Sequence, residues 1–404
     1  MNFLNYISDT SDVTDRGLQH WIDEGYIQVA HHDEFPLSMY TYTRKAVYEG
    51  KWDKVTSKCR GIIVNDLTLE IVARPFEKFH NYASSEVSDG STLPSLNPLL
   101  STPPVVWEKM DGFMATMYTW EGRNYIASKG SFHSPHAKWA TAEFNRVIKA
   151  KGYAEDGGSL REGYTLVFEG LNKDLRIVVD YGKRQELVLL AVIDNETGEE
   201  LEPEALREFA DAAGFRTPQK FDISLADATR ITMATGVGTH GTGNAVDEGF
   251  VATWYRNGQP PFRLKIKYVE YLRLHRLVTG MSPKHIWETL SQGLDTTEYV
   301  KNSTPWFKAF FEKWQRVFTT KAMSIELNAK DVYAEALDAV GDWDTYGNLG
   351  QVRKRFAEVV NLPENKEFSS VAFAMLDGKD FRPIIWKMVK GLAKNAHTLR
   401  DATQ

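Results

Sequence analysis

Through the first two thirds of the chain, short runs of β-branched and aromatic residues alternate with turn residues such as Asp194-Asn195 and Thr197-Gly198. Short runs bounded by turns are typical of β-strands. The predicted strands are residues 61–64, 113–118, 164–168, 177–179, 186–193 and 250–254. Residues 137–149 and 203–213 are helical stretches that lie between these runs. The pattern predicts a mixed α/β domain over residues 1–275.

After about residue 275 the strand-like alternation disappears and helical spacing takes its place. Thr304-Pro305 has the form of a helix N-cap followed by a proline at the first helical position. Aromatic residues then recur every three to four positions, at Phe307, Phe310, Phe311, Trp314 and Phe318. This spacing favours one buried helix face over a platform for stacking bases. The sequence therefore predicts an all-α domain over residues 276–404, and an α+β protein as a whole.

The composition is compatible with two soluble domains. A chain of 404 residues with 42% hydrophobic residues is long and apolar enough to bury two cores. It contains no stretch of about twenty apolar residues, so no membrane span is expected, and residues 1–15 lack the pattern of a signal peptide. The single cysteine, Cys59, excludes an intramolecular disulfide and a multi-cysteine zinc site, and it favours a structural thiol in a reducing cytoplasm.

The charge of the chain is unevenly distributed. The net charge is −6, which is not typical of a nucleic-acid-binding protein. Basic residues nevertheless gather in two places: Arg263, Lys265, Lys267, Arg273 and Arg276, and then Lys379, Arg382, Lys387, Lys390, Lys394 and Arg400. Such runs are more often solvated helix faces than phosphate-binding patches, so they decide nothing by themselves.

The tetrapeptide Lys109-Met110-Asp111-Gly112 is the feature that indicates chemistry most directly. A deprotonated lysine in a loop before a strand can attack the α-phosphate of a nucleotide and hold the nucleotide as a phosphoramidate. Deprotonation requires nearby cations or desolvation to lower the pKa of the lysine. The glycine lets the backbone approach a ligand closely. Alone this tetrapeptide is a weak signal.

Further charged residues follow in an informative order. Glu169 and Glu248 lie in or beside predicted strands and are candidates for Mg²⁺ ligands, direct or through water. Strand periodicity places Lys265 and Lys267 on one face, where two ammonium groups could hold a triphosphate and lower the pKa of a nucleophilic lysine. Any one of these residues is more often an exposed charge in a strand, but the ordered set favours a phosphoryl-transfer site.

This ordered set resembles the collinear motifs of covalent nucleotidyltransferases, the group of ATP-dependent ligases and mRNA capping enzymes. Three further segments are similar to the bacteriophage RNA ligase 1 family in particular. They are Cys59-Arg60-Gly61-Ile62, residues 74–81 and Ser128-Lys129-Gly130-Ser131. The resemblance covers residues from about 55 to 275. It implies a nucleotidyltransferase domain with antiparallel sheets, followed here by the helical domain as a possible RNA-specificity module.

The resemblance implies roles for particular residues. Lys109 would accept AMP from ATP. Glu169 would touch the ribose or the metal shell, and Glu248 would bind the Mg²⁺. The remaining residues of the ATP and phosphate site would be Arg60, Lys78, Asp111, Gly112, Lys129, Lys265, Lys267 and Tyr271. One departure is Leu175, which precedes Arg176 where the family often has asparagine.

The expected reaction joins RNA ends bearing a 5′-phosphate and a 3′-hydroxyl, with repair of nicked tRNA as the expected task. ATP, Mg²⁺ and RNA are the implied substrate, cofactor and partner, with no obligate protein partner and a cytoplasmic location (the host cytoplasm for a phage-encoded chain). DNA ligases and capping enzymes usually continue into a β-barrel, whereas this chain turns helical. A capping-type enzyme and a non-catalytic RNA-binding protein on the same fold remain alternatives; the intact Lys109 argues against the second.

Two further patterns resemble ligand-binding motifs but favour purely structural interpretations. Residues 236–241 spell G-x-G-x-x-G, but they neither follow a clear strand nor open a helix, so a loop is favoured over a dinucleotide-binding turn. His31, His32, His133 and His136 suggest metal ligands, but without nearby cysteines or an ordered acidic set they are interpreted as surface or hydrogen-bonded histidines.

Overall fold

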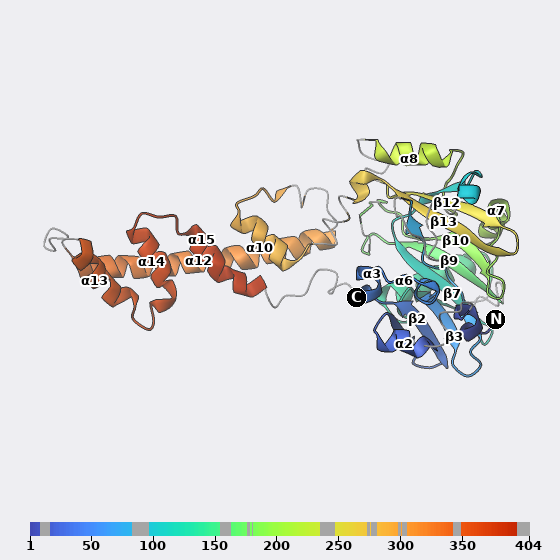
Figure 1. Ribbon diagram of the computed structural model, residues 1–404, viewed down its shortest axis with the longest axis horizontal. Helices are drawn as coiled ribbons and strands as arrows, with labels where there is room; N and C mark the ends of the chain where they lie inside the picture. The colour runs from blue at the N-terminus through green and yellow to red at the C-terminus, as the bar shows by residue number, and fades with distance from the viewer. Residues whose placement is uncertain are drawn as a thin grey trace. The chain divides into compact units, whose positions relative to one another are not determined.

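A computed structural model describes residues 1–8, 17–82, 97–153, 163–175, 178–179, 181–234, 247–272, 275, 281–297, 300, 305–341 and 349–393 (Figure 1). The chain divides into two compact units, Met1–Leu274 and His275–Gln404. The first unit carries strands and helices, and the second carries helices alone among its described residues. The predicted fold class, a mixed α/β part followed by an all-α part, is confirmed.

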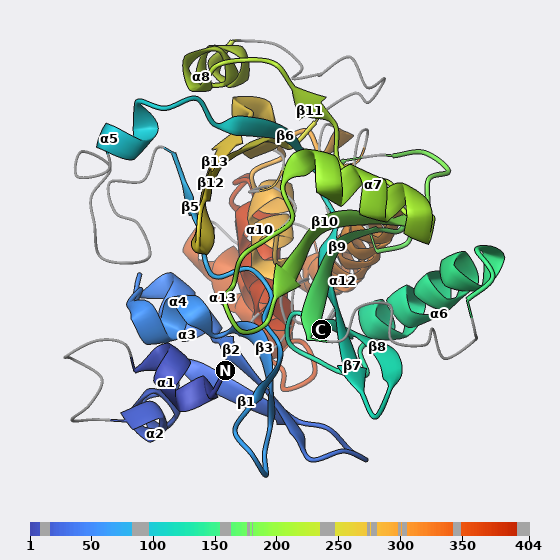
Figure 2. The same cartoon turned by 90° about the vertical axis from the view of Figure 1, so that its right-hand side faces the viewer.

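The first unit begins with a four-stranded antiparallel sheet in the order β1-β2-β3-β4. Its strands are β1 (Ile27–His31), β2 (Leu37–Tyr42), β3 (Arg60–Asn65) and β4 (Ile71–Ala73). Short helices lie beside it: α1 (Phe3–Ile7), α2 (Gly17–Asp23), α3 (Arg44–Tyr48) and α4 (Lys54–Lys58). Figure 2 shows these helices beside the sheet. Phe3, Trp21, Val55 and Ile62 belong to the core that α1, α2 and α4 share with the sheet.

A second sheet has the order β10-β9-β7-β8 and is antiparallel throughout. Its strands are β7 (Phe113–Trp120), β8 (Arg123–Ser128), β9 (Tyr164–Leu171) and β10 (Glu186–Asp194). Helices α6 (Pro135–Ala150) and α7 (Pro203–Ala213) pack on it through a core that includes Phe144, Phe168 and Phe215. Helix α6 begins here because the Ser134 hydroxyl accepts from the Ala137 amide and Pro135 occupies the first turn.

A third sheet has the order β11-β6-β12-β13-β5. Its strands are β5 (His80–Asn81), β6 (Val105–Lys109), β11 (Lys220–Phe221), β12 (Gly249–Arg256) and β13 (Gln259–Lys267). Only the β13–β5 pair is parallel among the described pairs. Helices α5 (Asn97–Leu100) and α8 (Leu225–Met233) contribute to the core beside this sheet.

The Lys109-Met110-Asp111-Gly112 segment connects the third sheet to the second, because Lys109 ends β6 and Phe113 begins β7. Gly112 is required at this crossing: a Cβ there would lie 2.3 Å from the Gly170 carbonyl oxygen. The backbone of β9 in the second sheet therefore lies close against the tetrapeptide at Gly112.

The second unit is built on α12 (Pro305–Val340), a helix of 36 residues and thus about 54 Å long at about 1.5 Å per residue. Its partners are α10 (Pro283–Ser291), α13 (Leu349–Val360), α14 (Ser369–Leu376) and α15 (Arg382–Val389), with 3₁₀ turns at Lys366–Phe368 and Lys390–Ala393. Phe307, Phe311 and Phe318 are fully buried, while Phe310 and Trp314 pack at the edge of the same core. The aromatic stripe is therefore core, as its spacing predicts.

One predicted strand, residues 177–179, is wrong where it can be compared. Val178 and Val179 form no strand, and Ile177 lies outside the described residues. The two valine amides donate to the carboxylate of Asp111 instead of to a neighbouring strand. The amides of this β-branched run thus bind a buried carboxylate in place of a neighbouring strand. Strand propensity describes the run itself and carries no information about such a partner.

Candidate active site

Lys109 lies at the junction of three strands. Gly249, at the start of β12, pairs with Lys109 of β6 on one side and with Lys267 of β13 on the other. A Cβ on Gly249 would lie 2.1 Å from the Ile266 carbonyl oxygen, and its φ is +145°, so glycine is needed at this point. The residue before it, Glu248, therefore reaches both lysines.

Glu248 forms a buried double ion pair. One carboxylate oxygen lies 2.7 Å from Lys109 Nζ and the other 2.8 Å from Lys267 Nζ, and Glu248 is only 4% exposed. The pKa of Glu248 is lowered: burial alone would raise it, but the two ammonium groups outweigh that effect. Glu248 is therefore ionised, as a metal ligand or an anchor for the lysine must be.

The pKa of Lys109 is raised in this environment. Burial acts to lower it, but the charges of Glu248, Glu169 and Asp111 and the hydrogen bond to Glu248 act more strongly in the other direction. The sequence-based expectation was that neighbouring cations lower the pKa. The acidic partners dominate, so Lys109 holds its proton and must lose it before it can attack.

Glu169 borders the other side of the tetrapeptide. Its Oε1 accepts a hydrogen bond of 2.9 Å from the amide of Gly112, because β9 lies beside β7 at this point. Burial raises the pKa of Glu169 to about 7. The charge of Lys109 opposes this shift, and the charge of Glu248 adds to it. This carboxyl therefore titrates near neutral pH and ionises fully once a cation approaches.

Asp111 holds the tetrapeptide in place. Its Oδ1 accepts from the hydroxyl of Tyr271 at 2.8 Å, and its Oδ2 accepts from the amides of Val178 and Val179 at 2.8 and 2.7 Å. The Asp111 amide donates to the Tyr181 hydroxyl at 2.8 Å. Burial and the charge of Glu248 raise the pKa of Asp111 to about 6, although these hydrogen bonds oppose the shift. Asp111 thus ties together three segments that are distant in sequence.

A group of cations borders the lysine. Burial and the charges of Arg60, Lys109 and Lys78 lower the pKa of Lys265 well below its usual range. Burial also lowers the pKa of Lys78 to about 8; the nearby Tyr42 opposes this shift, while Arg60 and Lys129 add to it. Positive charges gathered this closely are suited to binding several phosphates.

Aromatic rings that sequence analysis missed support these cations. Lys129 Nζ lies 4.4 Å from the centre of the Tyr42 ring, and Lys78 Nζ lies 4.6 Å from that of Trp52. The two rings meet edge to face, with centroids 5.1 Å apart. The sequence does not indicate these contacts. Lys78 and Lys129 are distant in sequence from the two rings, and neither the strand of Tyr42 nor the loop of Trp52 was among the predicted elements.

Two carboxylates flanking a lysine fit a divalent cation only if other ligands complete the shell. No cluster of three or more His, Cys, Asp and Glu suited to a metal occurs among the described residues. Mg²⁺ typically keeps several waters and binds one or two carboxylates plus substrate phosphates. Glu169 and Glu248 therefore fit a metal that arrives with a nucleotide.

Two of the features for which the sequence favours a structural role, the histidines and Cys59, can be compared with the structure. His32 Nδ1 accepts from the amides of Glu34 and Phe35, and the His32 and His133 rings are 5.0 Å apart without a metal-binding cluster in the described part of the chain. Cys59 is fully buried, which raises the pKa of its thiol. Residues 236–241 lie outside the described residues. No described helix is long and apolar enough to cross a membrane.

A comparison with protein families decides the assignment. Residues 58–271, which include Lys109, Glu169 and Glu248, match the family described as RNA ligase. The chain belongs to the RNA ligase family. The resemblance inferred from the motifs is thereby confirmed.

This RNA ligase family member is also similar to individual proteins. It is 26% identical to the RNA ligase of Rhodothermus phage RM378 over 383 residues, 82% of this chain and 83% of that one. It is 30% identical to a "Putative RNA ligase" of Thermovibrio ammonificans over 225 residues, 54% of this chain, and so spans about half (53%) of that relative. An archaeal ATP-dependent RNA ligase aligns with a TM-score of 0.42 and 14% identity, over 88% of this chain and 78% of that one.

Proposed function

We propose that this RNA ligase family member joins RNA 5′-phosphate and 3′-hydroxyl ends at the expense of ATP, through AMP carried on Lys109. The observation that supports this most is the placement of Lys109 Nζ 2.7 Å from Glu248, at the edge of the cation group. The candidate nucleophile Lys109, the carboxylate of Glu248 and the cations that would bind phosphates thus lie close together. A non-catalytic RNA-binding protein would need no such buried lysine.

The reaction follows from this arrangement in three transfers. Lys109 Nζ loses a proton and attacks the α-phosphorus of ATP; a P–N bond forms and the bond to pyrophosphate breaks. A 5′-phosphate oxygen of RNA then attacks the same phosphorus, and the P–N electron pair returns to Lys109. Finally the 3′-hydroxyl, losing its proton, attacks the RNA 5′-phosphorus and AMP leaves.

The cation group and the carboxylates have separate tasks in these steps. Arg60, Lys78 and Lys265 would stabilise the charge that builds on the departing pyrophosphate. Glu169 and Glu248 would hold the divalent cation, Mg²⁺, which supplies positive charge to the reacting phosphate when bound. Glu248 would share its carboxylate with such a cation, and its contact with Lys109, which contributes to the raised pKa of the lysine, would then be weaker.

The metal requirement is expected to depend on pH. Because the pKa of Glu169 is raised to about 7, its protonated form dominates below pH 7 and must lose a proton to bind metal. The Mg²⁺ concentration that half-saturates adenylylation should rise toward about tenfold per pH unit below 7 and level off above it. Adenylylation measured across Mg²⁺ at pH 6, 7 and 8 checks this, with Glu169→Gln as a control without the titrating group. Equal half-saturation at pH 6 and 8 would argue against metal at Glu169.

Labelled nucleotides test the proposed function directly. The protein is incubated with radiolabelled ATP or GTP and Mg²⁺, and then with 5′-phosphorylated RNA. An RNA ligase should form a covalent AMP adduct and seal RNA. A capping-type enzyme would form a GMP adduct, and a non-catalytic RNA-binding protein would form none; either result rejects the proposal.

We propose that the helical unit selects the RNA. The proposed natural substrate is nicked tRNA in the cytoplasm, and no obligate protein partner is expected. The support is the basic cluster predicted near the C-terminus: Lys379, Arg382, Lys387 and Lys390 are exposed on or beside α15. Lys394 and Arg400 lie outside the described residues. Lys379 and Arg382 have acidic neighbours, Asp377 and Asp380.

Charge reversal at Lys387 and Lys390 should therefore weaken binding of structured RNA. Each lost phosphate contact is expected to reduce the slope of log affinity against log salt by about one unit. Binding of a nicked tRNA is measured from low to high salt, with adenylylation as an internal control and a reversal of Lys308 and Lys330 as the matched variant. An unchanged salt slope would mean that these lysines do not contact the RNA.

A further inference from the structure

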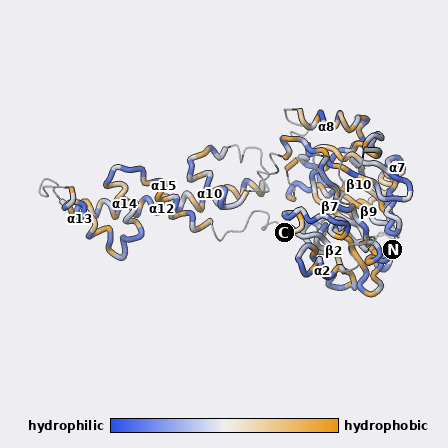
Figure 3. The backbone as a smooth tube through the Cα atoms, viewed as in Figure 1, coloured by the Kyte–Doolittle hydropathy of each residue, from blue (hydrophilic) through white to orange (hydrophobic). Residues whose placement is uncertain are grey.

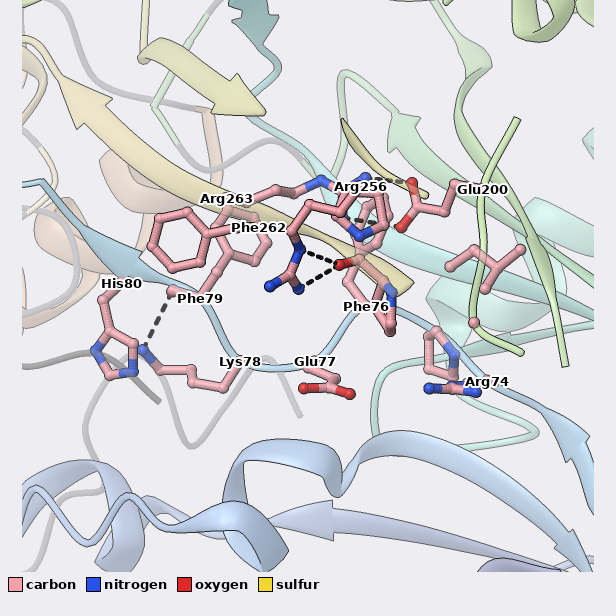
Figure 4. Close-up of a pocket in the computed structure, with 15 residues that line it drawn as sticks. Arg74, Phe76, Glu77, Lys78, Phe79, His80, Glu200, Arg256, Phe262 and Arg263 are labelled. Atoms are coloured by element: carbon pink, nitrogen blue, oxygen red, sulfur yellow. Dashed lines mark hydrogen bonds and ion pairs between the residues drawn. The ribbon is translucent and has the colours of Figure 1, made fainter. Parts of the chain in front are cut away.

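Charged side chains outside the active site differ in whether the chain itself supplies a partner for them. In the pocket drawn in Figure 4, Arg263 pairs with the carboxylate of Glu200. Arg256 donates to the carbonyl oxygen of Pro260 and has a further partner as well. The long helix α12 carries a group of charged side chains for which the described part of the chain supplies no such partner.

These side chains lie on the side of α12 that faces away from its core. Helices α10, α13, α14 and α15 contact α12 (Figure 1), and hydrophobic and hydrophilic residues alternate along the helices of this unit (Figure 3). Phe311, Phe318 and Ile325 of α12 are buried in the core. At about 100° of rotation per residue, the opposite side of the helix includes six exposed residues. They are Lys313, Arg316, Met323, Leu327, Asp331 and Asp338, and they are called the outer face below.

The charges of the outer face are ordered along α12. Lys313 and Arg316 lie in the first half of the helix, and Asp331 and Asp338 lie in the second half. None of these four side chains forms an ion pair with another described residue. Asp338 lies in the last helical turn, where the helix dipole disfavours a negative charge. The stability of α12 itself therefore does not account for this order.

Two apolar side chains separate the charged ends of the outer face. Met323 is 70% exposed and Leu327 is 62% exposed, and they are neighbours one helical turn apart. Glu312 and Lys330, which lie beside the outer face, each pair with a residue of α12 four positions away. The outer face thus has a basic end, an apolar centre and an acidic end.

A surface with this order is complementary to a second copy of itself in the antiparallel direction. When Met323 of one helix lies opposite Leu327 of the other, the two-fold axis passes beside residue 325. Lys313 then lies within about one residue of Asp338 of the second copy. A parallel arrangement would instead bring like charges together, which is unfavourable.

The same alignment also suits the remaining charges. Arg316 lies opposite Ala334 of the second copy, an exposed small residue that leaves room for the long side chain. The guanidinium then lies between Asp331 and Asp338 of the second copy, each about one helical turn away. All four charges of each outer face therefore gain a partner of opposite sign from one alignment of the apolar centre.

We propose that α12 pairs in the antiparallel direction with α12 of a second copy of this chain, so that the protein forms a homodimer. The pair covers Met323 and Leu327 of both copies and joins the basic end of each outer face to the acidic end of the other. Exposed ion pairs are individually weak, so the dimer dissociates on dilution. This pairing does not depend on the ligase activity.

The mass of the full-length chain as a function of concentration is the first test. Sedimentation equilibrium at low ionic strength, from about 1 to 100 µM, should show a mass that rises from that of one chain towards that of two. Added salt should move this transition to higher concentration, because it screens the charges. The mass of a single chain at every concentration would overturn the proposal, whatever else covers the outer face.

Charge reversal tests the direction of the pair. Lys313→Glu with Arg316→Glu makes both ends of the outer face acidic, and Asp331→Lys with Asp338→Lys makes both ends basic. Each double variant should raise the dissociation constant of its homodimer at least about tenfold, because like charges then face each other. All four substitutions in one chain should restore the wild-type dissociation constant, as should mixing the two double variants.

A matched control separates these effects from a general effect of charge. Lys138→Glu with Lys354→Glu changes two exposed lysines, on α6 and α13, and should leave the dissociation constant unchanged. Circular dichroism checks that every variant is folded. Double variants that dimerise like the wild type, or a fourfold variant that stays monomeric, would overturn the antiparallel pair.

Cross-linking locates the two-fold axis. Ser324→Cys places an exposed thiol near the axis, and Ala309→Cys places one near the end of α12, whereas the native Cys59 is fully buried. A short bismaleimide should link two copies of Ser324→Cys. It should not link two copies of Ala309→Cys, whose thiols lie about 48 Å apart along the antiparallel pair. Equal linking of both variants, or linking of neither at concentrations where the mass doubles, would overturn the proposal.

Discussion

Lys109→Ala is expected to reduce formation of the AMP adduct to background, by more than about 10⁴-fold, as removal of a covalent nucleophile does in other enzymes. The alanine has no electron pair to offer the α-phosphorus. Glu248 keeps its 2.8 Å contact with Lys267, so the buried carboxylate retains a cationic partner and the fold should survive. The measurement is transfer of labelled AMP from ATP, with circular dichroism and thermal unfolding recorded on the same sample.

Lys109→Arg is the sharper companion variant, because it preserves the positive charge beside Glu248. It should fail equally, since a guanidinium stays protonated and cannot attack. Lys173→Ala, at an exposed lysine paired with Asp174, serves as the control and should label normally. Normal labelling of either Lys109 variant would mean that another residue carries the AMP.

Glu248→Ala and Glu169→Ala should each slow adenylylation by about 10²–10³-fold, and excess Mg²⁺ should restore only part of the rate. Glu248 contacts both Lys109 and Lys267, and Glu169 accepts from the Gly112 amide. Each carboxylate therefore shapes the site as well as attracting a cation, and a higher metal concentration cannot replace that contact.

The two glutamate variants should differ in their effect on the stability of the fold. Loss of Glu248 leaves two partly buried ammonium groups without their shared anion, so Glu248→Ala should also destabilise the fold, by about 1–3 kcal/mol. Urea unfolding measures this loss, and Glu204→Ala, at an exposed glutamate of α7, is the control. Wild-type rates for both Glu169→Ala and Glu248→Ala across a Mg²⁺ titration would reject the metal site.

The sequence predicted much of the first unit because the relevant signals are local. Residues 187–193 form a continuous apolar run within β10, and Ser134-Pro135 starts α6. The order of the motifs along the chain could be seen in the sequence, but the pairing of their strands could not. That Gly249 pairs with both Lys109 and Lys267 depends on strand register between distant segments, and local propensity carries no information on it.

The electrostatic state of the site also required the structure. Two lysines on one face of β13 suggested a lowered pKa for Lys109, but Lys267 is bound to Glu248, and the carboxylates outweigh the cations. Likewise, the role of Asp111 in binding Val178, Val179 and Tyr271 depends on buried hydrogen bonds between segments that are up to 160 residues apart. Burial and partner geometry set such pKa values, and neither can be derived from residue order.

The most direct test of the central claim is a single-turnover chase. Protein labelled with AMP is separated from ATP and pyrophosphate, the labelled residue is located by peptide mass spectrometry, and the adduct is mixed with Mg²⁺ and RNA bearing a 5′-phosphate and a 3′-hydroxyl. The account predicts AMP on Lys109, its transfer to the RNA 5′-phosphate, and then sealed RNA with release of AMP, all without added ATP. AMP found on another residue, or an adduct that RNA ends leave unchanged, would contradict it.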